Sequence, residues 1–170
     1  MAGYGLPKEQ HLSVVLQNSL KLEGYSIEIM NGSVSGSTSA GGLNIAEWTL
    51  SENNIDLMIL CLGANDMLRG ISPKETKNNL EEIIKITKSK NIKVIIAGMI
   101  SPTSYGFSYK NSFDKIFSDL SKKHKLQLIP FLLEGVAQKP EFNLSDGMHP
   151  NDQGTIIISN TLKKAILENL

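Results

Sequence analysis

The stretch Ile55-Asp56-Leu57-Met58-Ile59-Leu60-Cys61-Leu62, followed by Gly63-Ala64-Asn65-Asp66, decides the fold. Seven of its first eight residues are apolar. A continuous apolar run of this length is typical of a strand that is covered on both faces of a parallel sheet. We therefore expect a buried strand over residues 55–62, with a polar loop at its carboxyl end.

Strands and helices alternate on both sides of this run. Apolar periodicity predicts helices over residues 8–22 and 39–51, one from Ser72 onward, one around residues 113–120 and one around residues 158–166. Ser72, Pro73 and Glu75 match a capping box at a helix start. Further strands are predicted at 26–31, 92–97 and 126–129, with loops at 101–110 and 131–149. The alternation indicates one α/β domain over residues 1–170, a three-layer α/β/α sandwich with a parallel sheet.

The order of these elements begins with a helix. Parallel strands are joined by crossover helices, yet no strand precedes the helix predicted at 8–22. The spacing alone therefore indicates that an opening strand is absent from these 170 residues.

Composition excludes several classes of protein. Seventeen basic side chains balance seventeen acidic ones, which argues against nucleic acid or an anionic membrane as partner. No apolar run approaches the length of a membrane span, and the first residues lack the pattern of a secretory signal. With one cysteine and three histidines, no metal-ligand cluster has the usual spacing, and no cofactor is implied.

Polar residues gather in the loops that follow the predicted strands, which is where open α/β sheets carry their sites. Asp146 and His149 lie three residues apart, so the carboxylate can orient the imidazole as a general base, although a helix-capping Asp and an exposed His explain them equally well. Asn65 can donate to an oxyanion or simply form a turn with Asp66. Gly36 can bring a backbone N–H close to a ligand or serve only as a turn residue.

Three segments together resemble blocks II, III and V of the SGNH (GDSL) hydrolases: Val34-Ser35-Gly36, Gly63-Ala64-Asn65-Asp66 and Asp146-Gly147-Met148-His149-Pro150. The likeness is strongest to the bacterial arylesterase, lysophospholipase and acyl-CoA thioesterase branch, and it covers nearly the whole chain. It implies a flavodoxin-like sheet and a serine ester hydrolase. It also implies that His149 is the general base, Asp146 its orienting partner, and Gly36 and Asn65 the oxyanion donors, all converging on one cleft.

The nucleophile of the family stands in block I, which reads Gly-Asp-Ser-Leu and commonly continues Thr-Ala-Gly-Tyr-Gly. Ala2-Gly3-Tyr4-Gly5 matches the continuation, which places Met1 at the Thr position and the serine two residues upstream. None of Ser13, Ser19, Ser33, Ser35 and Ser37 is a convincing substitute. We therefore expect the 170-residue chain to be inactive or nearly so, because its start site was called too late or its sequence was trimmed. The alternative is a catalytically inactive binding module.

The resemblance also implies a partner and a location. The partner is a small acyl or aryl ester or thioester, and Tyr105, Phe107, Phe131 and Leu132 are candidates for its binding wall, although core packing explains some of them as well. The protein would be bacterial, and periplasmic or secreted if a signal peptide precedes the missing segment, otherwise cytoplasmic. The sequence indicates no oligomeric state.

Overall fold

The computed structural model describes residues 2–51 and 54–170. The chain forms two compact units. The central unit is Gly36–Phe131, and the terminal unit combines Met1–Ser35 with Leu132–Leu170. The prediction of a single domain over residues 1–170 stays a prediction.

The central unit is built on a parallel sheet. Its strands are β1 (Leu57–Leu60), β2 (Lys93–Ala97) and β3 (Gln127–Ile129), in the order β1-β2-β3. Leu57 pairs with Lys93, and Ile95 pairs with Gln127. Along β2 the four residues from Val94 to Ala97 are buried in succession, as expected for a strand without a solvent face. The predicted parallel α/β architecture is confirmed.

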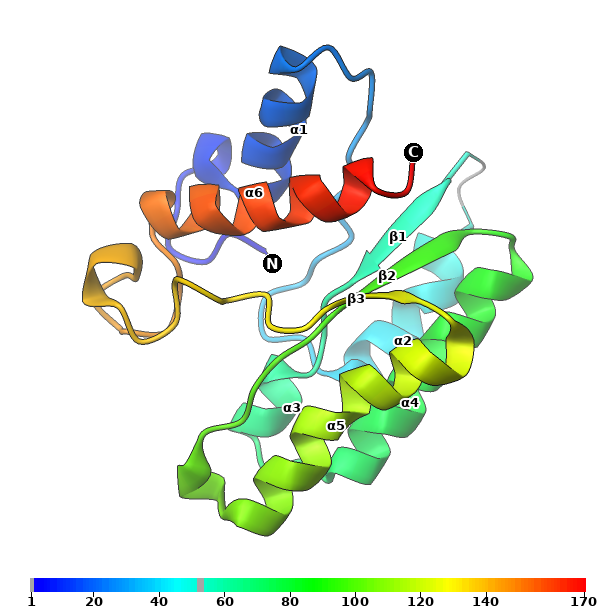
Figure 1. The fold of residues 1–170 in the computed structure, drawn as a ribbon, viewed down its shortest axis with the longest axis vertical. Helices are drawn as coiled ribbons and strands as arrows, with labels where there is room; N and C mark the ends of the chain where they lie inside the picture. The colour runs from blue at the N-terminus through cyan, green and yellow to red at the C-terminus, as the bar shows by residue number, and fades with distance from the viewer. Residues whose placement is uncertain (1, 52–53) are drawn as a thin grey trace. The chain divides into compact units, whose positions relative to one another are not determined.

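The helices of the central unit are α2 (Ser39–Thr49), α3 (Ala64–Leu68), α4 (Pro73–Ser89) and α5 (Phe107–His124), with a 3₁₀ turn η2 at Thr103–Tyr105. Figure 1 shows α2, α4 and α5 together on one side of the sheet. They bury one apolar cluster against β1 and β2, made of Ala46, Leu60, Met67, Leu80, Ile83, Ile84, Val94, Ile96, Phe113, Ile116, Phe117 and Leu120. Each large apolar side chain in such a cluster contributes roughly 1.5–3 kcal/mol to folding.

The terminal unit is helical. It contains a 3₁₀ turn η1 (Lys8–Gln10), α1 (Leu12–Leu22), a second 3₁₀ turn η3 (Pro140–Phe142) and α6 (Asp152–Leu167). Helix α1 lies beside α6 (Figure 1), and Lys163 Nζ on α6 donates to Ser19 Oγ on α1 at 2.9 Å. The two helices bury Leu12, Leu16, Leu20, Ile158, Leu162, Ala165 and Ile166.

The strand predicted at residues 26–31 is wrong. This segment has no regular secondary structure, and the backbone N–H of Ile29 donates to Gln17 Oε1 at 2.8 Å instead of to a neighbouring strand. The prediction rested on Ile27 and Ile29, which alternate with polar residues at the period of a strand. A strand also needs a partner, and none of the described residues supplies one here.

Several other boundaries differ from prediction. Helix α5 begins at Phe107, inside the predicted loop 101–110, and the predicted loop 131–149 contains η3. The capping box is not formed: the Ser72 side chain makes no cap bond, while its carbonyl accepts from the N–H of Thr76 at 3.0 Å. Pro73 has no N–H to satisfy at this helix start, so fewer donors need a cap.

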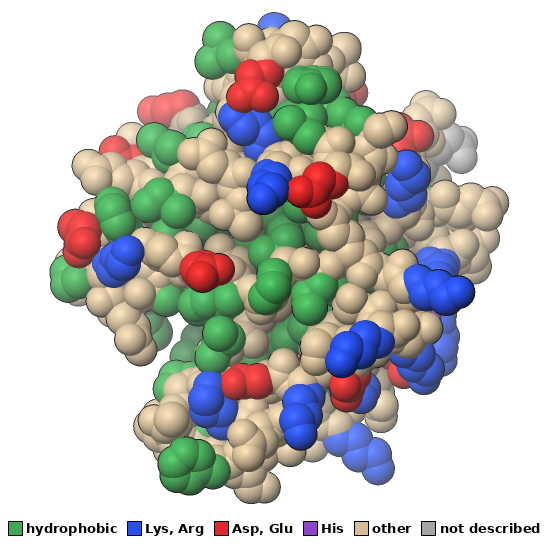
Figure 2. Space-filling view, in the orientation of Figure 1, with side chains coloured by type: hydrophobic (Ala, Val, Ile, Leu, Met, Phe, Trp, Pro, Cys, Tyr) green, Lys and Arg blue, Asp and Glu red, His purple; other side chains and the backbone are tan. Residues whose placement is uncertain are grey.

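Basic and acidic side chains are interspersed over α4 and α5, as Figure 2 shows at lower right. Lys77 pairs with Asp119 at 2.7 Å, and Lys123 pairs with Glu81 at 2.6 Å, so both pairs join the two helices. Lys88 stands in the last turn of α4, where it complements the helix dipole. Exposed pairs of this kind contribute at most about 1 kcal/mol each, so the apolar cluster carries the packing of α4 on α5.

Leu80 tests that cluster, because it is 0% exposed at its centre. Leu80→Ala should lower the free energy of unfolding by about 2–5 kcal/mol, from lost burial and the cavity left behind. Urea unfolding followed by circular dichroism measures the loss. The exposed Leu22 on α1 gives a control, and an equal loss in Leu22→Ala would show that the cluster is not the main source of stability.

Candidate active site

Asp146 and His149 form a hydrogen-bonded pair in the terminal unit. Asp146 Oδ2 lies 2.7 Å from Nδ1 of His149, and the imidazole is 43% exposed. A carboxylate at Nδ1 fixes the tautomer that places the proton there and leaves Nε2 as a base. Within the described part of this unit, Nε2 has no hydrogen-bond partner, so it is free to take a proton from a substrate or a nucleophile.

The loop that carries the pair is held by its own backbone. The N–H of Leu144 donates to the carbonyl of His149 at 2.7 Å, and the N–H of Gly147 donates to the carbonyl of Leu144 at 2.9 Å. Asn143 and Pro150 then form an antiparallel bridge that closes the loop. The helix that follows begins at Asp152, with Asn151 as its N-cap.

The second carboxylate oxygen of Asp146 is bound by the backbone. Oδ1 accepts the N–H of Met148 and the N–H of His149, each at 2.9 Å. The backbone bond from His149 has the largest effect on the pKa of Asp146. Together with the bond from Met148 and the bond to the imidazole, it lowers this pKa to about 2. Asp146 is therefore ionised at any pH near neutrality.

Tyr4 packs on the imidazole, a contact that sequence reasoning missed. Its ring centroid lies 4.4 Å from that of His149, with the planes tilted by 33°. The segment that carries Tyr4 is tied back to the start of α1 by a 3.1 Å contact between His11 Nε2 and the carbonyl of Leu6. Met1, to which the sequence assigned the Thr position of block I, lies outside the described residues. The chain immediately after that position thus runs alongside His149.

Gly36 and Asn65 come together in the central unit. Asn65 Nδ2 donates to the carbonyl of Ser37 at 3.0 Å, and Arg69 Nη2 donates to the carbonyl of Gly36 at 2.8 Å. Gly36 has φ of 74°, which favours glycine, and a Cβ added there would meet only Arg69, at 3.7 Å. Apart from Arg69, nothing crowds the backbone at Gly36, and its role as an oxyanion donor stays a prediction.

Asn65 lies in a helix and not in the polar loop that the sequence predicted after the buried strand. Residues 61–63 leave β1, and α3 starts at Ala64 after Gly63, whose φ is 113°. A Cβ at Gly63 would lie 3.2 Å from Phe117 Cζ, so glycine provides both the turn and the close packing. Helix α3 has five residues, which is too short for a periodic signal to reveal it.

The four proposed substrate-binding residues have different surroundings. Phe107 is 76% exposed at the start of α5, and Tyr105 is 37% exposed in η2, with its ring 5.5 Å from that of Tyr109. Phe131 is partly buried at the end of the central unit. Leu132 is 1% exposed, so it is a core residue and offers no surface to a substrate in this structure. Hydrophobicity alone did not separate Leu132 from the other three.

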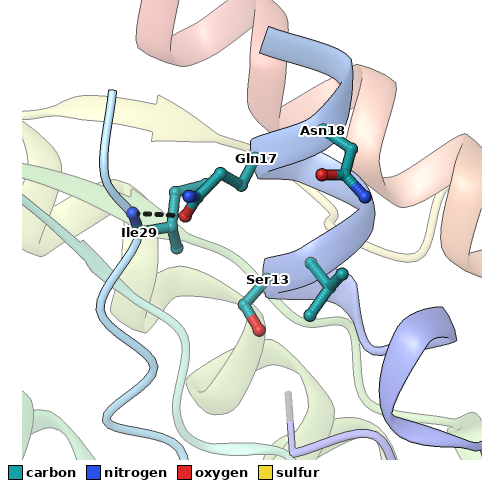
Figure 3. A pocket seen from close by; sticks show the side chains of 5 residues that line it. Ser13, Gln17, Asn18 and Ile29 are labelled. Atoms are coloured by element: carbon teal, nitrogen blue, oxygen red, sulfur yellow. Dashed lines mark hydrogen bonds between the residues drawn. The ribbon is translucent and has the colours of Figure 1, made fainter. Parts of the chain in front are cut away.

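A hollow of about 160 Å³ lies in the terminal unit, lined by Ser13, Val14, Gln17, Asn18 and Ile29. Figure 3 shows Gln17 pointing from α1 toward Ile29, where its side chain accepts the backbone N–H of residue 29. None of the residues predicted from the sequence to carry the site lines this hollow.

Three further observations concern metal ligands, the cysteine and membrane helices. Within residues 2–51 and 54–170, no three His, Cys, Asp or Glu side chains lie close enough to hold a metal. Burial raises the pKa of the Cys61 thiol, which disfavours the thiolate that a cysteine nucleophile needs. No helix in the described part of the chain is long and apolar enough to cross a bilayer.

Comparison with known proteins gives consistent results. Residues 1–155 match the family described as GDSL-like Lipase/Acylhydrolase. An arylesterase of Vibrio mimicus is 34% identical over 169 residues, which cover 99% of this chain and 84% of the relative. Esterase TesA of Pseudomonas aeruginosa is 36% identical over 149 residues, 88% of this chain and 74% of the relative.

Solved structures agree in fold. A crystal structure of TesA has a TM-score of 0.93 at 32% identity, covering 99% of this chain and 94% of that one. The esterase EstA from Pseudoalteromonas, in a structure described as inhibited by monoethylphosphonate, also has a TM-score of 0.93, at 29% identity over 98% of this chain and 91% of that one.

The ionisation of Asp146 provides a test of the site geometry. An NMR titration of its carboxyl carbon should give a midpoint near 2, because three hydrogen bonds favour the charged form. Since this pKa lies below its unfolded value, ionised Asp146 stabilises the fold above about pH 4. That contribution disappears as the pH falls through about 2.

The variant His149→Ala separates the effect of the imidazole on the pKa of Asp146 from the effect of the two backbone N–H groups. It removes the imidazole but keeps both backbone N–H groups, so the midpoint of Asp146 should rise only in part and stay below the ordinary value of 3.8. A midpoint at or above 3.8 in the unsubstituted protein would contradict the loop geometry described here.

Proposed function

The chain belongs to the GDSL-like lipase/acylhydrolase family, and on that premise we propose that it hydrolyses small acyl or aryl esters through an acyl-serine intermediate. The observation that carries this proposal is the Asp146–His149 pair, with its 2.7 Å bond at Nδ1 and an Nε2 for which residues 2–51 and 54–170 supply no hydrogen-bond partner. An oriented imidazole with a free nitrogen is the base that a serine nucleophile requires.

The proposed mechanism has two steps. Nε2 of His149 takes the serine proton as the hydroxyl attacks the ester carbonyl, and Asp146 stabilises the imidazolium that forms. The Gly36 N–H and the second N–H of the Asn65 amide hold the negative oxygen of the tetrahedral intermediate. His149 then returns its proton to the leaving group and activates water, which releases the acyl group. This mechanism requires both pairs of residues to face one substrate.

The nucleophile in this proposal is a serine two residues upstream of Met1, in a block I segment of the complete protein. The contact between Tyr4 and His149 supports it, because Tyr4 belongs to the block I continuation. From Ala2 to the proposed serine there are three residue steps, which span at most roughly 10–11 Å. A serine at that place therefore stays within this distance of Ala2, which is two residues from the Tyr4 ring that contacts His149. The first strand of the family would precede it.

The substrate class follows from the names of the relatives. They are an arylesterase, an esterase, and a thioesterase 1/protease 1/lysophospholipase L1 of Escherichia coli, the last 32% identical over 138 residues. We propose a small acyl or aryl ester or thioester as substrate, with Tyr105, Phe107 and Phe131 beside the acyl or aryl group. The relatives are bacterial, and we propose a periplasmic or secreted location if a signal peptide precedes block I.

Activity with p-nitrophenyl acetate tests the nucleophile. The 170-residue chain should hydrolyse this ester at close to the background rate, since loss of the serine in a comparable triad costs about 10⁶-fold in kcat. A chain extended upstream with the native block I should show ordinary turnover. Ordinary turnover by the 170-residue chain would refute the upstream serine, and an extended chain that folds but stays inactive would favour the inactive binding module.

His149→Ala in the extended enzyme tests the base. The proposal expects activity to be abolished, because no other group in it takes the serine proton, while circular dichroism and the melting temperature stay close to those of the parent. His124→Ala is a matched control, since this histidine pairs with Glu81 on the α4–α5 surface. Retained activity in His149→Ala would remove His149 from the base role.

The oxyanion donors can be tested through Asn65. Asn65→Ala in the extended enzyme should lower kcat by about 10²–10³-fold with KM nearly unchanged, because the donor acts on charge that develops only in the transition state. Asn111→Ala, on an exposed turn of α5, is the control. A crystal structure with a phosphonate bound to the serine should place a phosphoryl oxygen within hydrogen-bond distance of Asn65 Nδ2 and Gly36 N. A phosphonate oxygen that meets neither donor would refute the shared site.

A further inference from the structure

One short helix binds the Gly36–Ser39 segment at three points. From α3 and its C-cap, Asn65 donates to the carbonyl of Ser37 and Arg69 to the carbonyl of Gly36. Between them Asp66 accepts the backbone N–H of Ser39 at 2.8 Å. The segment that carries one proposed oxyanion donor is thus fastened to the helix that carries the other.

Asp66 is the buried member of this set, at 0% exposure. Its Oδ2 takes the Ser39 N–H, and its Oδ1 takes the hydroxyl of Ser39 and, at 3.2 Å, the hydroxyl of Thr76. Asn79 Nδ2 on α4 donates to Ser39 Oγ at 3.0 Å and so fixes that hydroxyl in turn. A buried carboxylate needs such donors, because an unpaired charge away from water is costly.

The direction of these bonds explains why a carboxylate fits here. Ser39 is the first residue of α2, an eleven-residue helix whose N-terminal N–H groups have no partner within the helix. A negative charge at that end interacts favourably with the helix dipole. Asp66 therefore holds α2 by its start, and the Gly36–Thr38 segment leads directly into that start. A shift of α2 would move Gly36 relative to Asn65.

Within the proposed function, on which this inference rests, we infer that Asp66 is a positioning residue for the oxyanion donors. It sets the position of the Gly36 N–H relative to the Asn65 amide without touching the substrate. Donors of this kind work only when held within about 0.5 Å of the productive geometry. Asn65 has two N–H groups on Nδ2, so its bond to Ser37 leaves one for the substrate oxygen.

Asp66→Asn in the extended enzyme tests the role. The substitution keeps the size of the side chain and removes the charge, and it changes an acceptor that faces Ser39 into a donor or forces the amide to turn. A misplacement of the donors on this scale should lower kcat by about 100-fold and leave KM within about twofold, because the donors act in the transition state.

Thr76→Val is the matched control. It removes one hydroxyl bond to the same carboxylate and is equally buried, but Thr76 belongs to α4 and does not lead to Gly36. It should lower the melting temperature and leave kcat within about twofold of the parent, since the Ser39 bonds remain. If Asp66→Asn does not fold, Ser39→Ala replaces it, because it removes the hydroxyl bond on the side of α2.

NMR of the Asn65 side-chain amide separates a failure of the positioning role from a failure of the proposed function. Its signals should move, and its protons exchange faster with solvent, in Asp66→Asn or Ser39→Ala but not in Thr76→Val. A kcat that falls equally in Thr76→Val, a change confined to KM, or unmoved Asn65 signals would overturn the positioning role. If the unsubstituted extended enzyme shows no hydrolysis, the proposed function fails, and the amide signals alone decide whether Asp66 positions Asn65.

Discussion

A carboxylate buried among neutral donors is the constraint on which the central unit depends. Asp66 is 0% exposed, and its two oxygens gather one backbone N–H and two hydroxyls from α2 and α4. Desolvation of a charge is costly, so each of these donors stabilises the assembled arrangement. The bonds to Ser39 hold the start of α2 at α3, and the bond to Thr76 holds the first turn of α4 there. Gly36 and Asn65 lie beside the bonds to Ser39.

The two aspartates of the candidate site illustrate how environment assigns a role. Asp66 is buried and bonds to two hydroxyls and a backbone N–H, whereas Asp146 is partly exposed and bonds to an imidazole. Both use one oxygen to bind backbone N–H groups. In Asp146 that bond fixes the carboxylate so that the other oxygen can hold His149 in one orientation. One aspartate thus holds two helices together, and the other orients an imidazole.

Much of this arrangement was predictable from local pattern. Helices α1, α4, α5 and α6 bury apolar residues at three- and four-residue spacing, and β1 and β2 are continuous apolar runs, so each signal lies within a dozen residues. The Asp146–His149 pair was also predictable, because three residues separate its members and a turn brings them together. Gly36 and Asn65, the other candidate residues, were predicted from the order of three family motifs.

Features that depend on distant partners escaped sequence reasoning. The sequence around residue 66 does not indicate that its carboxylate bonds to Ser39, 27 positions earlier. The sequence around Tyr4 likewise does not indicate its ring contact with His149. Residues 26–31 have the alternation of a strand but no neighbour among the described residues to complete it. Helix α3 is too short to show a period. Leu132 and Phe107 are both apolar in the sequence, yet the fold buries Leu132 and leaves Phe107 exposed.

The make-up of the terminal unit affects the order in which the protein folds during translation. It joins the two ends of the chain, and the bond between Lys163 and Ser19 spans 144 positions. The central unit is contiguous and can close while translation continues, since domains generally fold as they emerge. Helix α1 must wait, without its partner, until α6 has been made and released. The loop of His149 directly precedes α6, so we expect it to settle after the central unit has been made.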